Sequence, residues 1–69
     1  MNEIIAPNIK RVIEEKCLKQ ASIAKQAGYT VQQFSAMVNG RKLVKDTDID
    51  KIATALNVDT NELFKKEGD

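Results

Sequence analysis

The sequence predicts an all-α fold, a bundle of five short helices in one domain that spans residues 1–69. Apolar residues recur at intervals of three and four along five segments, which is the period of an amphipathic helix. Residue types typical of helix ends separate these segments, and no stretch alternates with the period of a strand. Because only one Tyr and two Phe are present, we expect a core of Ile, Val, Leu, Ala and Met.

The first two helices are predicted from apolar spacing and from the residues that end them. The first helix carries four apolar residues on one face, Ile5, Ile9, Val12 and Ile13. Pro7 fits its first turn, where the missing N–H costs nothing, and the helix should end near Lys16 or Cys17. The second helix runs over Gln20–Ala27, and Gly28 provides the left-handed residue that stops it.

The third helix is predicted to begin at Thr30, because Gln33 three residues later completes a capping box. Asn39 and Gly40 form a turn that ends it. Its buried residues should be Phe34, Met37 and Val38.

Two more helices are expected after a basic loop over Arg41–Lys45. Asp46 or Thr47 should cap the fourth helix, whose buried residues are Ile49, Ile52, Ala53 and Leu56. Asp59 and Glu62 have the spacing of a second capping box, which predicts a short fifth helix with Leu63 and Phe64 pointing inward.

The composition argues against several classes of function. With no His and one Cys, the usual zinc sites and the Ser-His or Cys-His catalytic pairs are excluded. We therefore expect no enzymatic activity, metal, cofactor or small-molecule ligand, and we expect Cys17 to be a small buried apolar residue. No signal peptide and no apolar run of about 18 residues is present, so we expect a cytoplasmic protein without a membrane partner.

Charge is distributed unevenly along the chain. Residues 10–45 contain eight Lys and Arg against two Glu, a net of +6, whereas residues 46–69 contain three Lys against seven carboxylates, a net of −4. This asymmetry predicts a basic face able to meet a polyanion, with an unevenly charged, solvated surface as the alternative.

Residues 20–41 satisfy together the constraints on two short helices that cross at a steep angle. Ala24 must be small because the next helix passes close to it, and Gly28 must adopt a positive φ. Ile23, Phe34 and Met37 must be apolar to fill the angle between the helices.

The segment resembles the helix-turn-helix family of phage repressors and Cro proteins, with a lambda-repressor-like bundle. The residues that match the family pattern are Gln20, Ile23, Ala24, Gly28, Phe34, Met37, Asn39 and Gly40. Residues 51–58 and 62–64 are similar to the fourth and fifth helices of that family, so the resemblance covers residues 7–65. It implies a sequence-specific transcriptional regulator, most directly a repressor, whose third helix enters the major groove of double-stranded DNA.

The resemblance predicts which exposed residues of the third helix contact bases. Gln32 and Gln33 can offer a donor and an acceptor to adenine, and the Ala36 methyl group can meet a thymine methyl, although a solvated helix face is the alternative. Ser35 suits either a base or a phosphate. Val31 either contacts a thymine methyl or packs inward, and packing is the favoured alternative.

Phosphate contacts are predicted at the start of the second helix and in the turns around the third. Gln20 can donate to a phosphate beside the free backbone N–H groups of its helix, as its family counterpart does. The further candidates are Lys19, Tyr29, Asn39, Arg41, Lys42 and Lys45.

The chain departs from the family pattern in three places, one of which is Val31, where many relatives carry a polar residue that reads the bases. Lys19 stands where relatives carry a capping Thr or Asn, which weakens that helix start by about 1 kcal/mol. Ile13 and Val38 stand where relatives carry an Arg and a Glu, and we predict that these two apolar side chains touch.

One recognition helix covers too few base pairs for tight binding, so we expect a homodimer on a pseudo-palindromic operator. The candidate dimer surface is formed by Leu56, Val58, Leu63 and Phe64, with Ile4 and Ile5, and the alternative is that these residues only close the core. The alternative function is a protein-interaction module, such as an antitoxin-like regulator that binds a partner through its acidic half.

Overall fold

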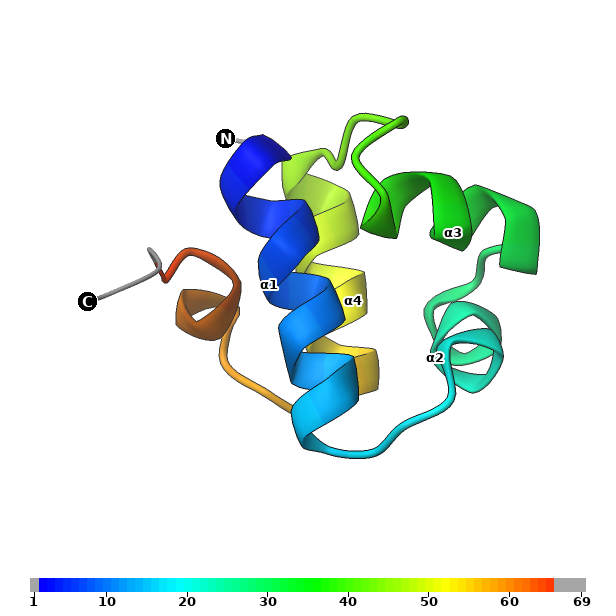
Figure 1. The fold of residues 1–69 in the computed structure, drawn as a ribbon, viewed down its shortest axis with the longest axis horizontal. Helices are drawn as coiled ribbons and strands as arrows, with labels where there is room; N and C mark the ends of the chain where they lie inside the picture. The colour runs from blue at the N-terminus through cyan, green and yellow to red at the C-terminus, as the bar shows by residue number, and fades with distance from the viewer. Residues whose placement is uncertain (1, 66–69) are drawn as a thin grey trace.

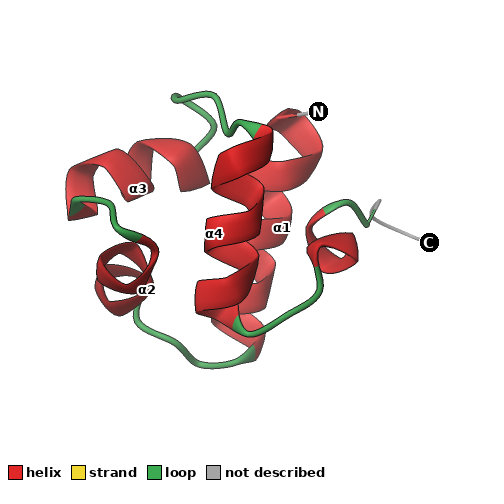
Figure 2. Cartoon of the chain, turned by 180° about the vertical axis from the view of Figure 1, so that it is seen from behind, coloured by secondary structure: helices red, strands yellow, loops and turns green. Residues whose placement is uncertain are grey.

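A computed structural model describes residues 2–65, which contain four α-helices, one short 3₁₀ helix and no strand. The elements are α1 (Asn2–Glu15), α2 (Gln20–Ala27), α3 (Val31–Val38), α4 (Asp46–Leu56) and η1 (Thr60–Leu63). Helices α1 and α4 lie side by side in the centre, with α2 and α3 on one side and η1 on the other (Figures 1 and 2). The predicted all-α helix-turn-helix class is confirmed, although the fifth helix is a 3₁₀ turn.

Helix α1 begins earlier than the sequence predicts. It starts at Asn2, so Pro7 lies in its second turn and the expectation of a first-turn proline is wrong. The chain tolerates this position because the apolar face continues toward the N-terminus, where Ile5 and Ala6 are buried. Burial on this face outweighs the single hydrogen bond that proline removes.

The N-cap of α4 lies before both of the expected caps. Its N-cap is Lys45, and Asp46 is already the first helical residue, so the prediction of Asp46 or Thr47 as the cap is wrong. The Lys45 N–H is satisfied by Asp48, whose Oδ2 accepts it at 3.0 Å. A lysine side chain cannot accept a hydrogen bond, so this start is capped from one side only.

The predicted capping box at the last helix is also incomplete. Asp59 Oδ1 accepts the Asn61 N–H at 3.3 Å. The Glu62 carboxylate forms ion pairs with Arg11 and Lys65 instead of accepting the Asp59 N–H. The segment forms a 3₁₀ helix of four residues. Phe64 follows that turn and is 38 % exposed, so the expectation that it points inward is wrong.

All four α-helices end in the same way, with a residue in the left-handed conformation followed by a hydrogen bond that spans five residues. The left-handed residues are Cys17 (φ 56°), Gly28 (φ 90°), Gly40 (φ 78°) and Asn57 (φ 59°). The closing bonds are Leu18 N–H to Ile13 O (2.9 Å), Tyr29 to Ala24 (2.8 Å), Arg41 to Ala36 (2.8 Å) and Val58 to Ala53 (3.0 Å). Cys17 is exposed in this turn, so the expectation of a buried thiol is wrong.

The apolar faces of the helices form one core. Its members are Ile5, Ile9, Val12, Ile13, Ile23, Ala24, Ala27, Phe34, Met37, Val38, Val44, Ile49, Ile52, Ala53, Leu56 and Leu63. Ile13 and Val38 both belong to this cluster, and their direct contact stays a prediction. Three residues expected on the dimer surface, Ile5, Leu56 and Leu63, are at most 1 % exposed, so that part of the expected surface is wrong.

The C-terminal segment is held against α1 by polar contacts. Asn8 is 8 % exposed, and its Nδ2 donates to the carbonyl oxygens of Leu63 at 2.8 Å and Lys65 at 2.6 Å. Arg11 Nη2 donates to the Glu62 carbonyl at 3.1 Å. These bonds satisfy carbonyl groups that the short η1 leaves without helical partners.

Candidate nucleic-acid interface

Helices α2 and α3 pack at a steep angle around a short turn (Figure 1). The predicted inward residues are buried on both helices: Ile23, Ala24 and Ala27 on α2, and Phe34, Met37 and Val38 on α3. Gly28 ends α2 with φ 90°, as predicted from the sequence. A packed inner face leaves the opposite face of α3 open to the surroundings.

The outward face of α3 carries the residues predicted to contact bases. Gln32 and Gln33 are exposed, whereas Ser35 and Ala36 are half-buried. Val31 is 54 % exposed, so the favoured alternative of inward packing is wrong. Val31 is the first residue of α3 and precedes the first buried residue of the helix, Phe34, by three positions.

The first turn of α3 is fixed by a complete capping box, as the sequence predicts. Thr30 Oγ1 accepts the Gln33 N–H at 3.0 Å, and Gln33 Oε1 accepts the Thr30 N–H at 3.0 Å. Two backbone donors that the helix itself cannot use are thus satisfied by side chains.

The start of α2 lacks such a cap. Lys19 is the N-cap, with φ −92° and ψ 126°, and makes no side-chain capping bond, as its residue type predicts. Gln20 is half-buried at the first helical position. The uncapped N–H groups and the positive end of the helix dipole leave this end suited to an anion.

The end of α3 and the following loop carry the remaining predicted phosphate contacts. Asn39 Nδ2 donates to Ser35, 2.8 Å from the carbonyl oxygen and 3.3 Å from Oγ, which holds both side chains against the helix end. Arg41, Lys42 and Lys45 are exposed in the loop. Val44 is 8 % exposed and anchors that loop in the core.

Tyr29 differs from the other predicted phosphate contacts. Its hydroxyl donates to Asp48 Oδ1 at 2.5 Å, and its ring stacks on Phe34 with centroids 6.3 Å apart. Burial and the Asp48 carboxylate raise the pKa of Tyr29, and the hydrogen bond from Tyr29 lowers the pKa of Asp48. The Tyr29 hydroxyl donates its only proton to Asp48, so it has no donor left for a phosphate. This hydrogen bond links the turn before α3 to α4.

Asp48 is the residue of this site that sequence reasoning missed. It lies 19 positions from Tyr29, and no local pattern links an acidic residue in one helix to a tyrosine in a distant turn. Its carboxylate also accepts the Lys45 N–H, so one side chain fixes both the turn before α3 and the loop after it.

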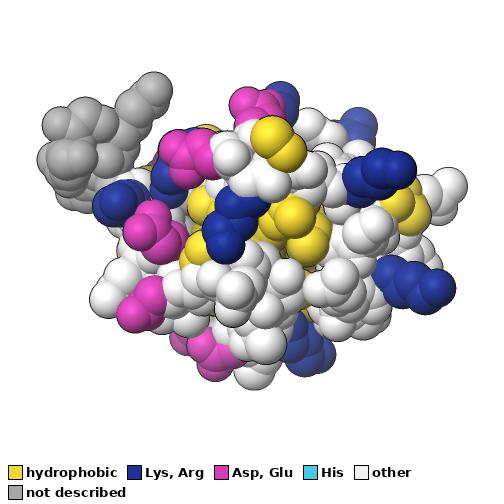
Figure 3. Space-filling view, turned by 90° about the horizontal axis from the view of Figure 1, so that it is seen from below, with side chains coloured by type: hydrophobic (Ala, Val, Ile, Leu, Met, Phe, Trp, Pro, Cys, Tyr) yellow, Lys and Arg dark blue, Asp and Glu magenta, His cyan; other side chains and the backbone are white. Residues whose placement is uncertain are grey.

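Charge on the folded surface follows the division along the sequence. In Figure 3, the side of the molecule on which α2 and α3 lie shows Lys and Arg side chains, and the acidic side chains gather on the other side. The exposed cations of α2 and of the segments beside α2 and α3 favour a polyanionic partner, and they are Lys19, Lys25, Arg41, Lys42 and Lys45.

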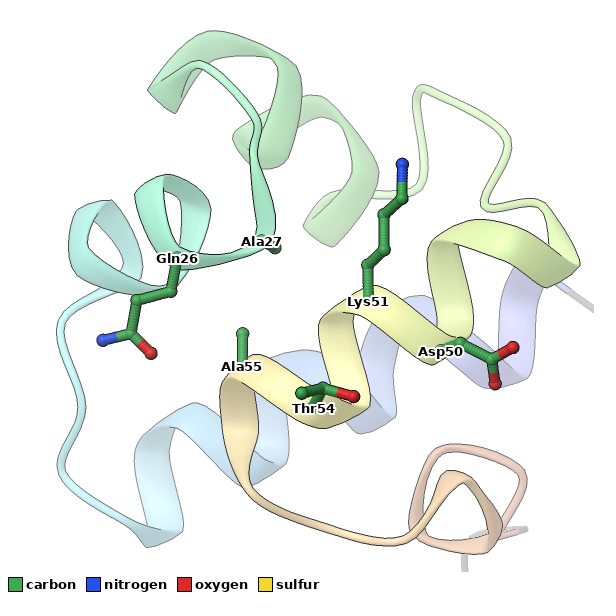
Figure 4. A pocket seen from close by; sticks show the side chains of 6 residues that line it. All are labelled: Gln26, Ala27, Asp50, Lys51, Thr54 and Ala55. Atoms are coloured by element: carbon green, nitrogen blue, oxygen red, sulfur yellow. The ribbon is translucent and has the colours of Figure 1, made fainter.

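The surface of the molecule also has shallow hollows. One of 440 Å³ lies between α2 and α4 and is lined by Gln26, Ala27, Asp50, Lys51, Thr54 and Ala55. The polar ends of Gln26, Asp50 and Lys51 point in three different directions, so they do not converge on a point as in a ligand pocket (Figure 4). Within residues 2–65, no three acidic or Cys side chains are grouped to hold a metal, and no helix has the length and apolar character needed to cross a membrane.

A helix start suited to phosphate, an exposed polar helix face and a basic loop after it, within an all-α bundle, are typical of a helix-turn-helix DNA-binding protein. The chain belongs to the family of Cro/C1-type helix-turn-helix DNA-binding domains, because the sequence model of that family matches residues 8–69. It is a DNA-binding transcription regulator of this family.

The fold is similar to a solved structure, the restriction-modification controller protein C.AhdI from Aeromonas hydrophila. The two chains superpose with a TM-score of 0.81 at 27 % sequence identity, and the match covers 87 % of each chain. None of the curated proteins matches this sequence.

Proposed function

We propose that this protein is a sequence-specific repressor that binds a pseudo-palindromic operator as a homodimer through α3. The observations that carry the proposal are the exposed polar face of α3, the uncapped start of α2 and the exposed cations of the basic loop. Phosphate contacts from the start of α2 and from the basic loop would set the register in which α3 meets the base edges. The likeness to a restriction-modification controller supports a role in the control of gene expression.

The proposed contacts divide into two sets. The base contacts come from Val31, Gln32, Gln33, Ser35 and Ala36, and the phosphate contacts come from Lys19, Gln20, Asn39, Arg41, Lys42 and Lys45. Within the first set, exposed Val31 suits a thymine methyl group. Tyr29 is left out of the second set because its hydroxyl serves Asp48.

Dimerisation is proposed because α3 is eight residues long, which is about 12 Å of helix. Two copies with recognition helices about 34 Å apart would read two half-sites on one face of the DNA. After removal of the core residues from the expected surface, Ile4, Val58 and Phe64 remain as its partly or fully accessible members. Repression would follow where such a site overlaps a promoter, in the bacterial cytoplasm that contains the DNA.

The test is selection from a random pool of duplex DNA, with the wild type and the Gln32→Ala/Gln33→Ala variant. We expect the wild type to enrich an inverted repeat and the double variant to lose it. Gln26→Ala is the matched control, because Gln26 is an exposed glutamine of α2 in the hollow against α4. Equal enrichment by the double variant, or no enrichment by the wild type, would contradict readout by α3.

The same DNA permits a test of the phosphate contacts. A dimer that neutralises roughly six to eight phosphates should lose affinity with a log–log salt slope of about −0.9 per phosphate.

Repression is measured with a reporter whose promoter overlaps the selected site. An increase in transcription on expression of the protein would show an activator and contradict the proposed sign of regulation.

A further inference from the structure

Gln32 and Gln33 are adjacent, exposed and chemically identical, yet their hydrogen bonds differ. Gln33 Oε1 accepts the Thr30 N–H at 3.0 Å, and the Gln33 N–H donates to Thr30 Oγ1 at 3.0 Å. The Gln32 carboxamide has no hydrogen-bond partner among residues 2–65. One amide therefore belongs to the helix start, and the other is free.

This difference decides what each amide can offer to DNA. Specific recognition of adenine by glutamine uses both ends of the amide, because the oxygen accepts from N6 and the nitrogen donates to N7. The Gln33 oxygen is turned back toward Thr30, so only the Nε2 donors face outward. A lone donor bonds equally well to N7 of either purine or to a phosphate oxygen, so it discriminates poorly between base pairs.

We infer that Gln32 is the specificity-determining amide of this pair and that Gln33 is a positioning residue. Gln32 pairs through both amide ends with an adenine, while Gln33 fixes the first turn of α3 and supplies donors without base preference. This assignment rests on the proposed function, since it presupposes that α3 lies in the major groove.

Glutamate substitutions separate the two roles. A carboxylate at position 33 can still accept the Thr30 N–H, so Gln33→Glu keeps the capping box and changes only what faces outward. A carboxylate at position 32 accepts from N4 of cytosine instead of reading adenine. We therefore expect Gln32→Glu to change the preferred base at one position of each half-site, and Gln33→Glu to select the wild-type sequence with uniformly lower affinity.

Alanine substitutions and thermal melts complete the test. Gln32→Ala should relax the preference for adenine at that position by roughly 5- to 150-fold, the equivalent of one two-ended amide contact, and leave Tm unchanged. Gln33→Ala should lower Tm and weaken binding to all sequences alike, and Gln33→Glu should restore Tm. Selection and melting are carried out on the full chain, with each variant first shown to be folded.

The outcomes are distinguishable from those of the proposed function. If the wild type enriches no sequence, the proposed function fails and the assignment of Gln32 fails with it. If the wild type enriches an operator but Gln33→Glu changes the preferred base, or Gln32→Glu does not, the proposed function stands and the division of roles is overturned.

Discussion

Cys17 occupies a position that glycine or asparagine fills at the ends of the other three α-helices. Its φ of 56° places a side chain where the left-handed conformation costs about 1–2 kcal/mol for an ordinary residue. The closing bond from Leu18 to Ile13 nevertheless forms at 2.9 Å, so the helix end is retained at the expense of local strain.

We predict that Cys17→Gly raises the free energy of unfolding by about 0.5–1 kcal/mol, less than the full strain because glycine also gains freedom in the unfolded chain. Urea unfolding under reducing conditions measures the change. Cys17→Ala is the matched control, because it removes the thiol and keeps the strain. Equal stability of the Gly and Ala variants would show that the positive φ is not costly at this position.

The Tyr29–Asp48 hydrogen bond makes a second residue-scale prediction, on pH. The pKa of Asp48 is lowered in the folded state, so its contribution to stability is present above the ordinary aspartate pKa of about 4 and is lost as the pH falls. The pKa of Tyr29 is raised, so its contribution is present below about 10 and is lost as the pH rises.

Tyr29→Phe should therefore lower the free energy of unfolding by about 1 kcal/mol between pH 5 and 9, a value reduced from that of a buried charged hydrogen bond by partial exposure to solvent. The difference from the wild type should shrink toward pH 3 and above pH 10. Urea unfolding across this range measures it. A difference that stays constant down to pH 3 would mean that the Asp48 carboxylate contributes nothing to the bond.

At the scale of elements, η1 is too short to be stable alone and depends on α1. Asn8 supplies two of the bonds that hold it, at 2.8 and 2.6 Å, from a position that is 8 % exposed. Asn8→Ala leaves both carbonyl groups without this partner, and we expect a loss of about 1–3 kcal/mol in the free energy of unfolding. Amide hydrogen exchange should locate the loss at η1.

The control for Asn8→Ala is Lys10→Ala, an exposed change on the same helix that should stay within about 0.5 kcal/mol of the wild type. If Asn8→Ala behaves like this control, burial of Leu63 and the Arg11 contacts with Glu62 hold the C-terminal segment without Asn8.

Helices α1 and α3 supply a further prediction through Ile13 and Val38, which are 7 % and 5 % exposed. Ile13→Arg or Val38→Glu alone would bury an unpaired charge, and each should cost about 3–5 kcal/mol. The double variant should recover about 0.5–3 kcal/mol of the summed loss if the two side chains meet. Strictly additive losses in urea unfolding would contradict contact between them.

The elements show how far local sequence signals reach. Apolar spacing and the Thr30–Gln33 box predicted α2, α3 and their buried faces, because each signal lies within one turn of the structure that it specifies. The left-handed turn at Cys17 was not predicted, because cysteine is not a residue type that indicates a positive φ. The cap at Lys45 and the hydrogen bond from Tyr29 to Asp48 depend on how α4 packs, which no local pattern encodes.

The same limit applies to the candidate site. Its location and exposed residues followed from the motif, since the buried stripe of α3 leaves one face outward. The unequal roles of Gln32 and Gln33 depend on which amide turns back to Thr30, and their shared residue type conceals this. Tyr29 was assigned to phosphate because the sequence gives it no visible partner.

At the scale of the whole molecule, most of the large apolar side chains are buried in the core. Leu56 and Leu63 are used to close the bundle, and the accessible apolar residues are few: Leu18, Val31, Leu43 and Phe64 among the large ones of residues 2–65. Val31 and Leu43 belong to α3 and the basic loop, on the side proposed to face DNA. Phe64 lies at the end of η1, next to the segment that Asn8 holds against α1.

Phe64 is therefore the strongest candidate for a dimer contact. We predict that Phe64→Ser leaves binding to a single half-site unchanged and weakens binding to the full operator by roughly 30-fold, the effect of losing one central aromatic contact. Sedimentation with operator DNA should show one protomer per duplex at concentrations where the wild type binds as two. Leu18→Ser is the matched control, because Leu18 is 36 % exposed against 38 % for Phe64 and lies in the turn between α1 and α2. If Leu18→Ser abolishes pairing and Phe64→Ser does not, the second copy packs against the α1–α2 turn instead.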